Sequence, residues 1–66
     1  MRKRPNKLQP MREAPKDGTI IDLWRDDTGW VRDVWFDADY EPDGWVTACP
    51  RPFVGWRLSR YARMMA

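Results

Sequence analysis

The chain contains no histidine and only one cysteine, Cys49, and these two shortages narrow its chemistry. Without histidine, acid–base catalysis would fall to carboxyl groups, whose pKa approaches neutrality only when they are buried or paired. A chain of 66 residues has little interior for that purpose. The lone cysteine forms no disulfide within the chain and has no histidine to activate it. We therefore expect a protein that is not an enzyme and holds no metal and no cofactor.

Long hydrophobic runs and clustered glycines are also missing. No stretch approaches the roughly 20 apolar residues of a membrane-spanning helix, and the basic start lacks the apolar segment of a secretion signal. The four glycines stand singly, which excludes a glycine-rich phosphate loop. The acidic stretch after Asp37 has Pro42 and Ala48 where a calcium loop requires glycine and glutamate. These observations favour a cytoplasmic protein with no membrane partner.

Aromatic residues, by contrast, are abundant, with five tryptophans among 66 residues. Each large aromatic side chain can bury roughly 150–250 Å², so a few of them can stabilise a small sheet without disulfides. Residues 1–9 are basic and show no periodicity, which is typical of a flexible arm. We therefore predict a basic flexible arm over 1–9 and a single small β-sheet domain over 10–66.

The fold prediction is mainly β (α+β). Residues 19–24 are β-branched and aromatic, as strands are, and the turn Asp26-Asp27-Thr28-Gly29 predicts a hairpin with left-handed Gly29. Residues 30–36 form the return strand, with Trp30 and Val34 on one face and Val31 on the other. Further strands are expected over 45–48 and 53–58. The result is a three- to four-stranded antiparallel meander.

Short helical pieces are expected at both ends of this sheet. Pro10 and Pro15 bracket at most one helical turn near the N-terminus. Ser59 is placed to cap a short C-terminal helix over residues 60–65. Six or seven residues make a marginal helix, so we expect it to depend on packing against the sheet.

One segment resembles a known family. The run Gln9-Pro10-Met11 … Ala14-Pro15-Lys16-Asp17-Gly18-Thr19 resembles the signature Trp-x-Pro-Ile-x-x-Ala-Pro-Lys-Asp-Gly-Thr of a family of small phage and prophage proteins. Leu8 stands near where that family has its first tryptophan. The later pairs Gly29-Trp30, Gly44-Trp45 and Gly55-Trp56 are similar to the Gly-Trp repeats of that family. The family has no assigned activity. The resemblance therefore implies a small β-sheet fold and a phage-like origin.

Charge is sharply partitioned along the chain. Residues 1–16 carry a net charge of +5, residues 17–43 carry −7, and residues 44–66 carry +4. The total of +2 thus conceals a strongly acidic middle. Local fields of this kind select and steer partners more than the net charge does.

Seven acidic residues of this middle segment are the candidate partner-binding site: Asp26, Asp27, Asp33, Asp37, Asp39, Glu41 and Asp43. Alternate residues of an extended chain point the same way about 6.6 Å apart, so we expect Asp37, Asp39 and Glu41 to form a row of carboxylates. Such a row suits a basic nucleic-acid-binding groove of another protein. The leading hypothesis is a phage-type, anti-CRISPR-like protein that inhibits a host nucleic-acid-handling defence complex. Its partner would be a protein with a basic nucleic-acid-binding groove, such as a CRISPR effector subunit. The chain would act as a DNA mimic and would not bind nucleic acid itself.

Three alternatives remain open. The acidic residues could simply occupy solvated loops and pair with the basic ends. The basic arm and the C-terminal arginines could instead bind nucleic acid, as an accessory domain does. A purely structural phage component would self-assemble, and the strand edges allow a monomer or a weak dimer.

An exposed tryptophan beside the carboxylates would anchor a protein interface, and Trp24 and Trp35 are the candidates.

Overall fold

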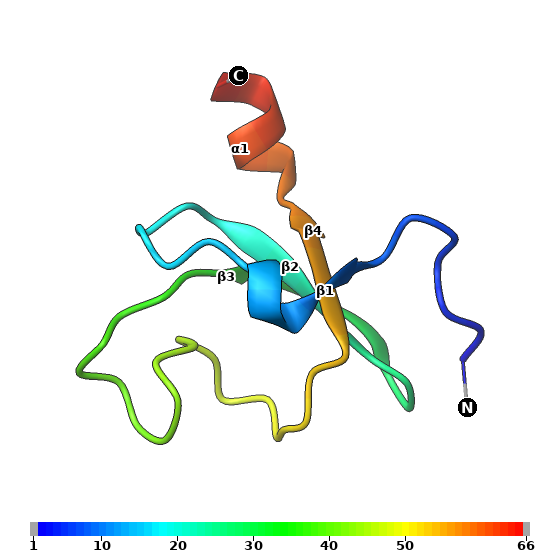
Figure 1. Ribbon diagram of the computed structural model, residues 1–66, viewed down its shortest axis with the longest axis horizontal. Helices are drawn as coiled ribbons and strands as arrows, with labels where there is room; N and C mark the ends of the chain where they lie inside the picture. The colour runs from blue at the N-terminus through cyan, green and yellow to red at the C-terminus, as the bar shows by residue number, and fades with distance from the viewer. Residues whose placement is uncertain (1, 66) are drawn as a thin grey trace.

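Four antiparallel strands form one sheet in the computed structural model, which describes residues 2–65 (Figure 1). They are β1 (Gln9–Pro10), β2 (Ile21–Arg25), β3 (Gly29–Val34) and β4 (Gly55–Leu58). The mainly β class predicted from the sequence is confirmed. The order across the sheet is β1-β4-β2-β3, so β4 returns to pair with β2 instead of following β3 as a meander would.

The β2–β3 hairpin forms where the turn residues predicted it. Arg25 pairs with Gly29 across the turn, and Gly29 adopts a left-handed φ of 87°. Glycine suits this position because a Cβ atom destabilises the left-handed conformation. The hairpin prediction is therefore confirmed.

A β-bulge in β3 changes which residues face the core. Leu23 pairs with Val31 and Ile21 pairs with Val34, so three steps along β3 match two along β2. The extra residue leaves Asp33 with a left-handed φ of 61°. Val31 and Val34 consequently pack against the same core. The prediction that they lie on opposite faces is wrong, because the bulge interrupts the alternation.

The strand predicted over residues 45–48 is also wrong. In this region the structure has an isolated bridge between Phe36 and Trp45, and a long loop continues to β4. The carbonyl oxygens of Trp45 and Thr47 accept hydrogen bonds from the Arg51 guanidinium instead of from a neighbouring strand. A side chain thus satisfies backbone groups that a sheet would otherwise have to pair.

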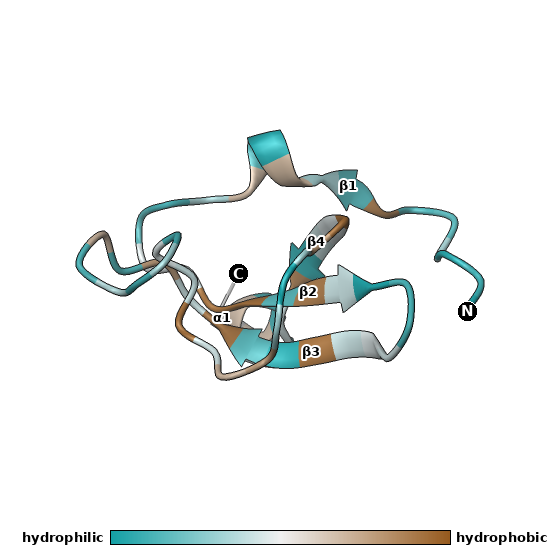
Figure 2. Ribbon diagram, turned by 90° about the horizontal axis from the view of Figure 1, so that it is seen from below, coloured by the Kyte–Doolittle hydropathy of each residue, from teal (hydrophilic) through white to brown (hydrophobic). Residues whose placement is uncertain are grey.

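The core lies between one face of the sheet and the segments that cross it. Its buried side chains come from the strands, from the turn before β2 and from the loop before β4: Ala14, Ile21, Leu23, Val34, Trp45 and Trp56. The 3-10 turn η1 (Met11–Glu13) forms between the two prolines as predicted and places Met11 against this core. Figure 2 shows hydrophobic residues alternating with hydrophilic ones along β2 and β3, and hydrophilic residues along most of the N-terminal segment and at the hairpin turn.

The opposite face of the sheet carries a buried ion pair. Asp22 is only 2% exposed, and its carboxylate accepts hydrogen bonds from Arg57 Nε at 2.8 Å and from the Asp33 N–H at 3.1 Å. The Arg57 guanidinium lies 4.0 Å from the centre of the Trp30 ring, and Trp30 packs edge-on against Trp24. Charge pairing and aromatic packing therefore stabilise this face together.

The two ends of the chain dock differently. The N-terminal arm runs beside the β2–β3 turn, where the Arg2 N–H donates to the Asp26 carbonyl at 2.7 Å. The helix α1 (Arg60–Met65) extends away from the sheet beyond β4 (Figure 1). The Ser59 hydroxyl accepts the Ala62 N–H at 3.1 Å, which confirms the predicted cap and helix. Among residues 2–65, no helix has the length and apolar character needed to cross a membrane.

Candidate partner-binding site

The structure divides the seven predicted acidic residues into two groups. Four of them form ion pairs with arginines: Asp26 with Arg4, Asp27 with Arg25, Asp33 with Arg60, and Asp43 with Arg51. The remaining three, Asp37, Asp39 and Glu41, are exposed and have no ion-pair partner within the described part of the chain. Pairing with the basic ends, which the more conservative alternative expects, accounts for three of the seven, because the partner of Asp27 is Arg25 of the acidic middle itself.

The two hairpin carboxylates are held by separate arginines. Asp26 accepts bonds from Arg4 Nε at 2.9 Å and from Trp24 Nε1 at 2.9 Å, and these bonds lower its pKa. Asp27 is bonded by both Nε and Nη2 of Arg25, which lowers its pKa to about 2. Both groups are thus ionised and already neutralised locally by arginines.

Residues 37–44, here called the acidic loop, are folded into turns and are not extended. The Tyr40 N–H donates to the Asp37 carbonyl at 2.9 Å, and the Gly44 N–H donates to the Tyr40 carbonyl at 2.7 Å. The Asp39 N–H also binds the Asp37 carboxylate at 3.0 Å. The predicted evenly spaced row is therefore wrong, because the alternation of an extended chain does not apply to consecutive turns.

The base of the acidic loop is closed by backbone bonds and by aromatic packing. The Asp37 N–H donates to the Gly44 carbonyl at 2.7 Å. Phe36 packs edge-on against Trp45 with 5.2 Å between ring centres. Gly44 has a φ of 89°, and a Cβ added there would lie 2.4 Å from Phe36 Cε1. The closure therefore requires glycine at this position for both conformation and space.

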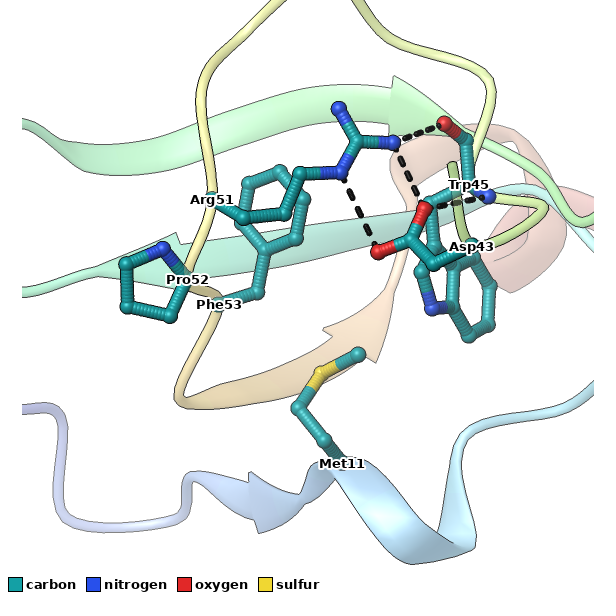
Figure 3. Close-up of a pocket in the computed structure, with 6 residues that line it drawn as sticks. All are labelled: Met11, Asp43, Trp45, Arg51, Pro52 and Phe53. Atoms are coloured by element: carbon teal, nitrogen blue, oxygen red, sulfur yellow. Dashed lines mark hydrogen bonds and ion pairs between the residues drawn. The ribbon is translucent and has the colours of Figure 1, made fainter. Parts of the chain in front are cut away.

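Arg51 is the main polar brace of this region, and sequence reasoning did not single it out. Its guanidinium donates to both carboxylate oxygens of Asp43, at 2.7 and 3.1 Å, and to the Trp45 carbonyl at 2.7 Å (Figure 3). It also reaches the carbonyls of Thr47 and Cys49. The pairing lowers the pKa of Asp43 and raises that of Arg51. The two prolines that flank Arg51 set it apart from the other C-terminal arginines, but they do not indicate which groups it bonds.

An exposed tryptophan flanks the acidic loop. Trp35 is 42% exposed and lies two residues before Asp37, and Tyr40 within the loop is 36% exposed. Of the two tryptophans predicted to be exposed, Trp35 is therefore confirmed. The prediction is wrong for Trp24, which is 6% exposed, because Trp30 packs against its ring and its indole N–H binds Asp26.

The basic segments are less available than their charge suggests. Of the four C-terminal arginines, Arg51, Arg57 and Arg60 are ion-paired with aspartates, as is Arg4 in the arm. The exposed Arg2, Lys3, Lys7 and Arg63 have no ion-pair partner among the described residues. The folded chain thus leaves a smaller basic surface than the linear sequence indicates.

No group of three or more metal-ligating side chains lies together among the described residues, and Cys49 is half-buried. In the comparisons with known proteins, no family model, no curated protein and no solved structure matches this chain. The resemblance to small phage proteins stays a prediction.

Proposed function

We propose that this protein binds another protein through the acidic loop and Trp35, and that it thereby occupies a basic nucleic-acid-binding groove. The observation that supports this proposal is that unpaired carboxylates and an exposed tryptophan lie together at the acidic loop. Asp37, Asp39 and Glu41 are exposed and unpaired in the described structure, and an exposed tryptophan lies two residues before them. The other four predicted carboxylates each form an ion pair with an arginine.

The bracing of the loop makes this surface suitable for binding. A flexible loop must lose conformational entropy when it binds, which weakens association. Here the loop is closed by the Asp37–Gly44 backbone bond and is held from below by the Phe36–Trp45 pair and by Arg51. Exposed tryptophans are frequent sites of large interface energy. Carboxylates around such an anchor add orientation and faster association.

The separation of charge within the molecule favours the same surface. The acidic loop and the N-terminal arm lie toward opposite ends of the longest axis, which measures 30 Å (Figure 1). Exposed charges are largely screened beyond about 8 Å at physiological ionic strength. The basic arm therefore does not cancel the field that an approaching partner meets at the acidic loop.

The partner in this proposal is a host protein that handles DNA or RNA, in the setting of phage infection. The resemblance of residues 10–19 to small phage proteins supplies that setting, and a defence complex such as a CRISPR effector is the target class. Its grooves are lined with lysine and arginine because they must hold phosphates. Carboxylates on a small rigid body can occupy such a groove and exclude the nucleic acid.

The alternative, a nucleic-acid-binding accessory domain, relies on the basic ends. It is supported by Arg2, Lys3 and Lys7, which stay exposed. It is weakened by the engagement of Arg4, Arg51, Arg57 and Arg60 in ion pairs, since phosphates would have to compete with these carboxylates. The acidic-loop proposal therefore has the stronger structural support.

The test compares two charge variants in affinity capture from cells that carry defence systems, with nuclease present. In the first variant, Asp37, Asp39 and Glu41 are changed to lysine. In the matched control, Arg2, Lys3 and Lys7 are changed to glutamate. We expect the first variant to lose a nucleic-acid-handling complex that the unchanged chain retains, because its lysines repel the basic groove. The control should retain that complex.

Two results would contradict the proposal. Capture of the same complex by the acidic-loop variant would show that the loop carboxylates are not the contact. Loss of capture in the arm variant alone, accompanied by gel-shift binding of bare nucleic acid by the unchanged chain, would instead favour the accessory-domain alternative.

A further inference from the structure

A pocket of about 360 Å³ opens beside the acidic loop, between η1 and the segment that precedes β4. Six residues line it: Met11, Asp43, Trp45, Arg51, Pro52 and Phe53 (Figure 3). It joins parts of the chain that are far apart in sequence, since Met11 belongs to η1 and the others to the long loop. The pocket exists only because the chain folds back over the sheet.

The pocket is lined mainly by apolar side chains, and its two charged residues form an ion pair with each other. Met11, Trp45, Pro52 and Phe53 supply hydrocarbon, aromatic surface and a thioether. Methionine and aromatic side chains adapt well to varied apolar groups. The remaining two residues, Asp43 and Arg51, are bonded to each other. The pocket thus offers its ligand little beyond apolar contact.

The pocket is large enough to accept an apolar side chain of a partner. Small-molecule sites usually range from about 300 to 1,000 Å³, so this pocket is at the lower end. A buried apolar cavity of roughly 150 Å³ already binds benzene. A polar metabolite would need unpaired donors or acceptors to orient it, and the ion pair between Asp43 and Arg51 leaves few. A leucine or phenylalanine side chain carried by a larger partner needs no such hydrogen-bonding groups, because the rest of the partner orients it.

The pocket is continuous with the acidic loop. Asp43 is the last acidic residue of that loop and also lines the pocket, and Gly44 joins it directly to Trp45. A partner segment that places an apolar side chain in the pocket would therefore bring its neighbouring residues near the unpaired carboxylates. Charge complementarity then requires those neighbours to be lysine or arginine.

We infer that the pocket is the anchor site for a partner segment in which one apolar side chain is flanked by lysine or arginine. This inference rests on the proposed function and names the chemistry of the partner. The apolar side chain enters among Met11, Trp45 and Phe53, and the basic neighbours lie against Asp37, Asp39 and Glu41. The acidic loop supplies charge attraction, and the pocket supplies discrimination between basic segments.

The experiment uses the full chain with methionine methyl groups labelled with ¹³C, because Met11 lines the pocket. Met64, which is 82% exposed on α1, is the internal control. Two short synthetic peptides serve as probes, Lys-Arg-Lys-Leu-Lys-Arg-Lys and the same peptide with serine in place of leucine. We expect the leucine peptide to shift the Met11 methyl signal, to leave that of Met64 unchanged, and to bind about tenfold more tightly than the serine peptide.

A filled-pocket variant supplies the second measurement. Met11→Trp places a larger side chain in the space, and its spectrum shows whether the chain is still folded. This variant should bind both peptides with the affinity that the unchanged chain has for the serine peptide. If the substitution unfolds the chain, the methyl shifts of the unchanged chain still decide the question.

Failure of this inference is distinguishable from failure of the proposed function. Equal binding of both peptides, with no Met11 shift, would overturn the anchor pocket while leaving the acidic-loop contact supported. Absence of binding by both peptides would also overturn it, whatever complex the chain captures from cells. A Met11 shift caused only by the leucine peptide would support it.

Discussion

Replacing Arg57 with methionine should destabilise the fold severely, because it leaves a buried carboxylate without its cation. Asp22 is 2% exposed, and Arg57 Nε at 2.8 Å is its ion-pair partner. Methionine keeps the length and apolar stem of the side chain and removes the charge. Asp22 would then keep only the Asp33 N–H as a donor.

The magnitude follows from the burial. Breaking a fully buried ion pair by removing one partner costs about 3–5 kcal/mol, and we expect the lower end of that range because the Arg57 side chain is 30% exposed. Losing the cation over the Trp30 ring adds about 0.5–2 kcal/mol. A chain of 66 residues has a total free energy of unfolding of about 3–10 kcal/mol. Arg57→Met should therefore remove a large part of the stability.

Urea unfolding followed by tryptophan fluorescence measures this loss directly. The control is Arg32→Met on the same sheet, because Arg32 is exposed and has no ion-pair partner among the described residues, and its cost should stay within about 0.5 kcal/mol. A double variant that also carries Asp22→Leu should recover part of the stability, since the buried charge is then gone. A loss below about 1 kcal/mol for Arg57→Met would refute the reasoning.

Three further predictions concern the site region. Arg51→Ala should cost about 2 kcal/mol, because it removes three carbonyl bonds and the partly exposed pair with Asp43, and it should speed amide exchange in the acidic loop. Acid should reduce the free energy of unfolding between about pH 4 and pH 2, because three paired aspartates have lowered pKa values. The pKa of Asp27 is lowered to about 2, and those of Asp26 and Asp43 are also lowered. Carboxylates with lowered pKa stabilise the fold above their unfolded pKa, and this contribution disappears as pH falls through the folded value. Gly44→Ala should destabilise by about 2 kcal/mol through the Phe36 ring and the positive φ.

Each of these has a matched control. Arg51→Lys should recover little of the stability that Arg51→Ala loses, since an ammonium group cannot reproduce the planar fork of the guanidinium. Stability equal to that of the unchanged chain would contradict the bracing role. Asp27→Asn should weaken the acid dependence, and an unchanged pH profile would count against its ion pair. Gly18→Ala shares a positive φ of 91° but meets no atom within 4 Å. If it cost as much as Gly44→Ala, the ring contact would be irrelevant.

Local chemistry made several elements predictable from the sequence. The β-branched run before Trp24, the glycine at position 29, the prolines around η1 and the Ser59 cap each act over a few residues. Their outcomes depend on backbone conformations that the residue itself favours or forbids. The structure confirms each of them, with strand ends shifted by one or two residues.

Long-range pairing was not predictable. Arg4 meets Asp26 across 22 positions and Arg57 meets Asp22 across 35, so the linear division of charge overstates the charge left at the surface. At the bulge, the Asp33 N–H donates to the Asp22 carboxylate, a contact that exists only once β2 and β3 have paired. Asp37, Asp39 and Glu41 could be identified as the unpaired carboxylates only once the structure showed that the other four predicted acidic residues form ion pairs.

The central claim is that the acidic loop competes with nucleic acid for a basic groove. The most direct measurement is the binding of labelled duplex DNA or RNA to the captured host complex, with the chain added as competitor. We expect the unchanged chain to displace the nucleic acid, and the variant with lysine at Asp37, Asp39 and Glu41 to displace none. If the chain and the nucleic acid bind the complex together, or if the lysine variant displaces nucleic acid equally well, the account is contradicted.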